Sequence, residues 1–190
     1  MTSGIVTHQV LFALGVGVLT FVSTNIDCAV VLIPSLWVGD GRRRGRYIAG
    51  CGIGNCAVLA AAALAAAGLT RLPGAWTAWL GVVPILMGLL SIRRNSPDPA
   101  QPQLIPSAAT GLIVTSALGV DNVLVLAPVI RAFGRLGGVV VLVHLLLFPT
   151  ALALVARARP GRLGHWHRPR AAGYLTIAVG ALLLGRQLIL

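Results

Sequence analysis

Long apolar stretches recur along the whole chain and are separated by short polar segments. Each stretch has about 17 to 25 residues, the length that an α-helix needs to cross the hydrocarbon core of a bilayer. Because lipid cannot satisfy the hydrogen-bonding groups of the backbone, we expect these stretches to be helices. The pattern predicts six spans: Val10–Leu36, Tyr47–Leu69, Trp76–Ile92, Pro106–Ile130, Val139–Ala156 and Ala172–Ile189.

The composition agrees with this pattern and argues against a water-soluble fold. Of the 190 residues, 57% are hydrophobic and 10% are charged. A globular core could not bury so much apolar surface. The prediction is an all-α integral membrane protein that forms a single transmembrane domain over residues 1–190.

The basic residues, all arginine, lie mostly on one predicted side of the membrane. The formal net charge of +11 would by itself suit a nucleic acid partner. An excess of basic residues in cytoplasmic loops orients membrane proteins, however, so we expect the odd-numbered loops inside and both termini outside. Lipid headgroups are then the secondary partner of this charge. The arginines of the odd-numbered loops are Arg42, Arg43, Arg44, Arg46, Arg93, Arg94, Arg157, Arg159, Arg162, Arg168 and Arg170.

The two halves of the chain carry a related element. Asp27 is followed seven positions later by Pro34, and Asp121 is followed seven positions later by Pro128, with Val and Leu matching between them. With three spans in each half, the second half must enter the membrane from the opposite side, as in the inverted repeats of many secondary transporters. The predicted repeats are residues 1–95 and 96–190.

Two of the four acidic residues lie where acids are costly. Asp40 and Asp98 fall among loop residues, whereas Asp27 and Asp121 lie inside apolar spans. An aspartate at membrane depth costs about 2.5 to 3.5 kcal/mol on insertion scales and is a functional hypothesis by default. We expect the two carboxyl groups to meet near the middle of the membrane and to bind a cation or a proton.

Polar residues and prolines accompany each aspartate. Pro34 and Pro128 cannot donate to the carbonyls of Val30 and Leu124, so main-chain oxygens are freed one turn beyond each carboxylate. The other candidate metal ligands are Asn25, Asn122 and His144, and the candidate pathway residues are Ser23, Thr24, Asn55, Gly119, Pro34 and Pro128. The alternative for these polar side chains, His144 included, is hydrogen bonding between helices.

Four short motifs resemble those of one transporter family. They are Phe21–Asp27, Gly45–Gly50, Leu80–Gly88 and Gly119–Asn122. Together they are similar to the motifs of cadmium-resistance transporters of the CadD type, within the lysine-exporter superfamily, and the resemblance covers nearly the whole chain. It implies a six-helix exporter of a divalent metal in the bacterial inner membrane, with Asp27 and Asp121 at its site.

The chain departs from the family pattern close to that site. Cys28 stands where the family has a second acid, Leu118 replaces an asparagine, and Leu126 replaces a tyrosine. A thiolate favours a soft cation such as cadmium or zinc, so Cys28 is a further candidate ligand. Cys28 lies about 100° around a regular helix from Asp27, and joint ligation requires local unwinding or a packed partner.

The absence of lysine leaves no Walker-type phosphate loop, so ATP hydrolysis by this chain is not expected. Export of a divalent cation against about 100 mV costs about 4.6 kcal/mol, which proton antiport could supply.

No catalytic set or cysteine pair indicates an enzyme, and no cofactor is expected beyond the transported metal. Export of manganese, nickel or a basic amino acid, or a non-transporting scaffold, remain alternatives. A homodimer is compatible with so small a bundle.

Overall fold

The computed structural model describes residues 2–38, 40–71, 82–93, 105–157 and 169–189. Helices account for 95% of these described residues, which contain no strand. The elements are α1 (Thr2–Val38), α2 (Gly41–Leu69), α4 (Val82–Arg93), α5 (Ala108–Leu118), α6 (Val120–Phe133), η2 (Gly134–Leu136), α7 (Gly137–Arg157) and α8 (Pro169–Ile189).

Three helical segments in the described part of the chain are long and apolar enough to cross a membrane. They are Thr7–Asn25, Gly41–Leu69 and Val120–Arg157. Large apolar side chains also face outward, as expected of a bundle surrounded by lipid rather than water. Leu64, Ile113, Leu146 and Leu154 are among these exposed residues.

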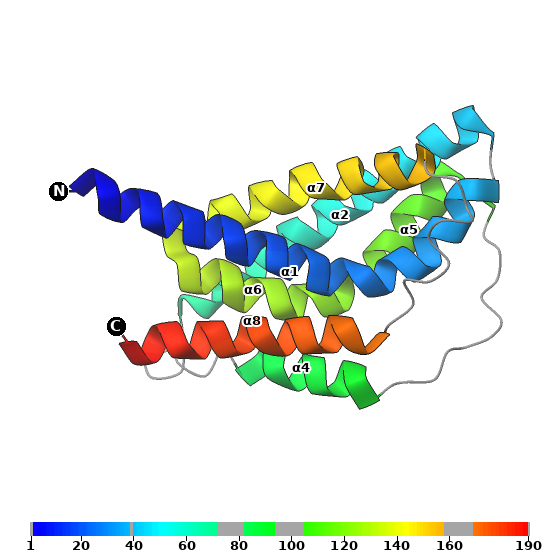
Figure 1. The fold of residues 1–190 in the computed structure, drawn as a ribbon. Helices are drawn as coiled ribbons and strands as arrows, with labels where there is room; N and C mark the ends of the chain where they lie inside the picture. The colour runs from blue at the N-terminus through cyan, green and yellow to red at the C-terminus, as the bar shows by residue number, and fades with distance from the viewer. Residues whose placement is uncertain (1, 39, 72–81, 94–104, 158–168, 190) are drawn as a thin grey trace.

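The helices form one elongated bundle (Figure 1). α2 packs along α5 and α6, α1 packs along α7 and α8, and α4 packs along α8. α1 and α7 run in the same direction, and α2, α5 and α6 run in the opposite one (Figure 1). The beginning of α1 and the end of α8 therefore lie at the same end of the bundle.

The observed helices extend or divide several of the predicted spans. α2 begins at Gly41 rather than Tyr47, because the Asp40 side chain caps it by accepting a 2.8 Å hydrogen bond from the Arg43 amide. α1 covers 37 residues, about 55 Å, and bends in its second half (Figure 1). The missing donor of Pro34 gives that bend a cause. The first residues of the predicted third span, 76–81, lie outside the described residues.

The predicted fourth span is two helices that meet at Gly119. α5 ends at Leu118 and α6 begins at Val120. The Gly119 carbonyl accepts hydrogen bonds from the amides of Asn122 and Val123, at 3.1 and 3.3 Å. A Cβ at Gly119 would collide with Val58, so the glycine also lets the α5–α6 junction approach α2.

Small residues bring α2 and α5 close together. A Cβ at Gly50 would collide with the main-chain carbonyl of Ala108, and one at Gly54 would lie 2.8 Å from that of Leu112. A Cβ at Gly111 would in turn lie 2.9 Å from the Cys51 amide nitrogen. Such small-residue contacts let helix backbones approach in membranes, where no hydrophobic effect drives helices together.

Two apolar clusters form the core at different depths of the bundle. The first comprises Ala13, Val16, Leu59, Ala62, Leu126, Val129, Phe133, Val140 and Val179. The second comprises Cys28, Leu32, Leu36, Tyr47, Cys51, Phe148, Leu152 and Ala156. α1, α2 and α7 supply most of the residues of these clusters, and the polar residues described next lie along α1, α2, α5, α6 and α7.

Candidate functional site

The predicted pathway residues Ser23 and Thr24 are buried on α1 together with Thr20, and the hydroxyls of all three bond to their own helix. Thr20 donates a 2.7 Å hydrogen bond to the Val16 carbonyl. The Thr20 carbonyl in turn accepts hydrogen bonds from Ser23 at 2.9 Å and from Thr24 at 2.8 Å. These donor bonds are therefore made within α1 rather than between helices. The Thr24 Oγ1 also accepts a 3.2 Å hydrogen bond from the Asn25 Nδ2, so one of its two lone pairs is occupied.

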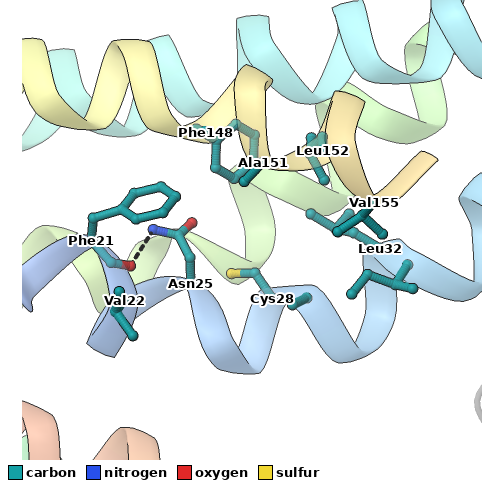
Figure 2. Close-up of a pocket in the computed structure, with 11 residues that line it drawn as sticks. Phe21, Val22, Asn25, Cys28, Leu32, Phe148, Ala151, Leu152 and Val155 are labelled. Carbon is teal, nitrogen blue, oxygen red and sulfur yellow. Dashed lines mark hydrogen bonds between the residues drawn. The ribbon is translucent and has the colours of Figure 1, made fainter. Parts of the chain in front are cut away.

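Asn25 and Cys28 lie beside a pocket of about 190 Å³ between α1 and α7 (Figure 2). The Asn25 Nδ2 donates a 2.9 Å hydrogen bond to the Phe21 carbonyl, which fixes the orientation of the amide. The Cys28 thiol is buried and lies 3.8 Å from the Thr24 carbonyl. Phe148, Ala151 and Leu152 of α7 line the opposite side of the pocket. Asn25 and Cys28, two predicted ligands, thus share one pocket with mostly apolar walls.

Asp27 lies between these two residues on α1, and its side chain lies outside the described residues. The same holds for the side chain of Pro34, although both backbones belong to α1. No contact of either side chain is therefore assigned.

His144 is a buried imidazole on α7 with one open nitrogen. Its Nδ1 lies 3.0 Å from the Val140 carbonyl. A carbonyl oxygen only accepts, so Nδ1 carries a proton, and in the neutral imidazole Nε2 then carries the lone pair. Nε2 is buried and has no hydrogen-bond partner among the described residues. The Phe21 ring of α1 meets the imidazole edge-on, with the ring centroids 5.6 Å apart. A neutral imidazole with its proton on Nδ1 can bind a metal through Nε2.

Asp121 occupies the first turn of α6, directly after the break at Gly119. The helix N-terminus stabilises a carboxylate at this position. The Asp121 side chain is exposed at the surface of the bundle, and Asn122 is half-buried. No hydrogen bond or ion pair among the described residues joins the Asp121 carboxylate to another predicted ligand. Pro128 lies buried inside α6.

The described residues do not by themselves complete a metal site. No group of three or more His, Cys, Asp or Glu side chains lies close enough to hold a metal ion within the described part of the chain. The three cysteines form no disulfide. The predicted ligands whose side chains are described lie singly on α1, α6 and α7, and a movement of the helices, or the Asp27 side chain, would be needed to form one site from them.

Sequence reasoning missed a second polar group, at the contact of α2 with α5. Tyr47, Cys51 and Thr115 are all buried there, close to the buried Asn55 of α2. A four-residue spacing links Tyr47, Cys51 and Asn55, and this signal could have placed them on one face of a helix.

Comparison of the chain with family models, with curated proteins and with solved structures gave no match.

Proposed function

We propose that the protein is a secondary transporter that exports a divalent heavy-metal cation, cadmium or similar, across the bacterial inner membrane in exchange for protons. The observation that carries this proposal is the interruption of an apolar helix at Gly119, immediately before Asp121. The Gly119 amide and carbonyl keep their hydrogen bonds to Thr115 and Val123, so what the junction supplies is the N-terminal end of α6. Secondary transporters use the ends of discontinuous helices to bind ions.

The pairing of the helices supports an inverted repeat of two three-helix halves. α2 of the first half packs along α5 and α6 of the second, and α7 of the second half packs along α1 of the first. If the two halves are exchanged, α1 takes the place of α5 and α6, α2 that of α7, and α4 that of α8. The first pairing then becomes the second, and the contact between α4 and α8 stays the same. The six described helical regions, with α5 and α6 taken as one span, alternate in direction along the bundle (Figure 1).

The position of the Asp121 carboxylate supports a neutralisation cycle. An exposed carboxylate on an apolar helix costs several kcal/mol in lipid unless it is protonated, binds a cation or is covered. In the proposed cycle, metal displaces the protons of Asp27 and Asp121 on the cytoplasmic side, and protons displace the metal outside. Metal binding of this kind is coupled to proton release because the ligands must be deprotonated.

The membrane potential requires such coupling. Moving a divalent cation outward against an inside-negative potential of about 100 mV costs about 4.6 kcal/mol. Exchange of two protons for one divalent ion moves no net charge, so the potential does not oppose it.

The experiment is metal–proton exchange in proteoliposomes. We expect Asp27→Asn and Asp121→Asn each to abolish cadmium-driven proton release. Asp40→Asn is the matched control, since it removes the same charge but keeps a good helix N-cap. Exchange that persists in either variant, or that fails equally in the Asp40→Asn control, would overturn the proposal.

A further inference from the structure

Four protic side chains from three helices form a continuous buried group, termed here the protic chain. It consists of Ser35 of α1, Tyr47 and Cys51 of α2, and Thr115 of α5. Their exposed fractions are 4%, 0%, 0% and 3%, respectively. None of the four belongs to the proposed metal site.

The members of the protic chain lie next to one another where α2 packs against its neighbours. Tyr47 and Cys51 are one turn apart on α2 and share one core cluster, a Cβ at Gly111 of α5 would lie 3.1 Å from the Cys51 Sγ, and one at Gly54 would lie 2.9 Å from the Thr115 Cβ. The electrostatic environment of the Tyr47 hydroxyl includes the Ser35 side chain. The close approach of α2 to α5 through their glycines places Thr115 beside α2. Ser35 lies one turn from the end of α1, whereas Thr115 packs against Gly54, about 10 Å deeper along α2 than Tyr47. The protic chain therefore leads from one end of the bundle into its interior.

Two oxygens of the protic chain lack a regular hydrogen bond. The Tyr47 hydroxyl and the Thr115 Oγ1 are buried, and neither makes a hydrogen bond of acceptable geometry with another described residue. The thiol beside them is a weak donor and a weak acceptor. Buried hydroxyls without partners are costly and rare in folded proteins, and an ordered water or ion is a usual explanation. Phenylalanine and valine would fill the same space without that cost.

We infer that the protic chain takes up water and relays protons between the arginine-rich end of the bundle and the α5–α6 junction. Water fits because the group offers three hydroxyls and one thiol, and an internal water typically has two to four polar partners. A dehydrated divalent cation does not fit, because the group contains no carboxylate. The Thr115 carbonyl accepts the amide of Gly119 at 2.9 Å, so the inner end of the protic chain adjoins the break before Asp121.

The relay leaves every group as it began. Each hydroxyl, thiol or water accepts one proton from its neighbour on the side of the α5–α6 junction and passes one proton to its neighbour on the side of the arginine-rich end, so no group is oxidised or consumed. The role of the relay in metal export rests on the proposed function, whereas the presence of water in the protic chain is independent of it. The two parts are tested separately.

The first experiment follows exchange of the Cys51 S–H proton with D₂O by infrared spectroscopy. In a Cys28→Ala, Cys56→Ala variant, Cys51 is the remaining thiol. We expect its S–H band to convert to S–D rapidly, as in a variant that retains the exposed Cys56 alone. Adding Thr115→Val or Tyr47→Phe should slow the exchange by about tenfold, the factor expected when a water loses one hydrogen-bond partner.

Matched variants make this result specific. Thr115→Ser keeps the hydroxyl and should keep fast exchange. Thr110→Val should also have no effect, because the Thr110 hydroxyl is already bonded to Ser107 beside α5 at 2.7 Å. Slow exchange of Cys51 in the otherwise unchanged protein, or equal rates with and without the Tyr47 and Thr115 hydroxyls, would overturn the inference.

The second experiment measures metal-driven proton release in proteoliposomes. We expect Tyr47→Phe to slow proton release by about tenfold while metal affinity is unchanged, because no metal ligand is altered. Unchanged release with fast thiol exchange would overturn the relay and leave the water. If the unaltered protein carries no metal at all, the proposed function fails, and the infrared result still decides whether the protic chain holds water.

Discussion

Arg44 at the start of α2 donates a 3.0 Å hydrogen bond from its Nη1 to the main-chain oxygen of Ala156 at the end of α7. The two helices belong to different halves of the chain, and this bond closes the end of the bundle that carries Arg42, Arg43 and Arg46. The carbonyls of the last turn of a helix have no partner within the helix, so a guanidinium from elsewhere is a natural cap.

We expect Arg44→Ala to lower the free energy of unfolding by about 1.5 to 3 kcal/mol, the range for hydrogen bonds that involve a charged group. Arg43→Ala is the control, because Arg43 is 66% exposed and its ion pair with Asp40 is long, at 4.0 Å. Surface pairs of this kind contribute about 0 to 1 kcal/mol. Thermal unfolding in detergent measures both, and equal losses would show that the Ala156 contact has no special role.

The glycines of α2 offer an internal comparison of packing. We expect Gly50→Ala to destabilise the bundle by about 3 kcal/mol or more, because its Cβ would overlap the Ala108 carbonyl and overpacking already costs about 1 to 3 kcal/mol in ordinary cores. A Cβ at Gly52, by contrast, would meet no atom within 4 Å. Gly52→Ala should therefore raise stability by about 0.5 to 1 kcal/mol through helix propensity. Unfolding in denaturant measures the change in stability for both variants. Stability changes of the same sign would contradict the close contact of α2 with α5.

Substitution of His144 can distinguish a structural role of this residue from a role as a metal ligand. We expect His144→Leu to leave the free energy of unfolding within about 1 kcal/mol, since it removes a buried Nε2 that lacks a partner among the described residues. Under the proposed function the same change should lower metal affinity by more than the roughly 10- to 100-fold typical of lost outer-shell partners. Isothermal titration with cadmium measures this, and His8→Leu at the exposed beginning of α1 is the control. Unfolding of the bundle with unchanged affinity in the folded fraction would assign His144 to packing alone.

Under the proposed function, the Cys28 thiol should determine which metal the pocket between α1 and α7 prefers. We expect Cys28→Ser to reduce cadmium binding more than manganese binding, and Cys28→Asp to reverse the preference, because thiolates select soft cations and carboxylates select hard ones. Cys56→Ser is the control, since Cys56 is exposed. Competition between the two metals in transport measures the preference, and an unchanged ratio in Cys28→Ser would exclude the thiol as a ligand.

Hydropathy predicts the helical class well, because lipid leaves the backbone few alternatives to a helix. It predicts the ends of the helices less well. α2 begins six residues before the predicted Tyr47, since a helix can continue beyond the apolar core through arginines when Asp40 caps it. The division at Gly119 also escapes prediction, because one glycine in an apolar run does not distinguish a packing contact from a break.

The candidate site is predictable as a list of residues and not as an arrangement. Ser23, Thr24, Cys28 and His144 are all buried, as expected of polar side chains that turn away from lipid inside spans. Their hydrogen bonds cannot be foreseen, because a hydroxyl in a helix bonds its own backbone or a neighbouring helix according to packing that the sequence pattern does not contain. The exposure of Asp121 is likewise not predictable, since periodicity assigns a residue to a face without saying what covers that face.

The shared acceptor on α1, the Thr20 carbonyl bonded by both Ser23 and Thr24, has a mechanical implication. When a helix accepts the hydrogen bonds of its own hydroxyls, no hydrogen bond from those hydroxyls to a neighbouring helix has to break if the helix rocks or rotates. Under the proposed function, a movement of α1 against α7 would therefore break no hydrogen bond donated by Ser23 or Thr24.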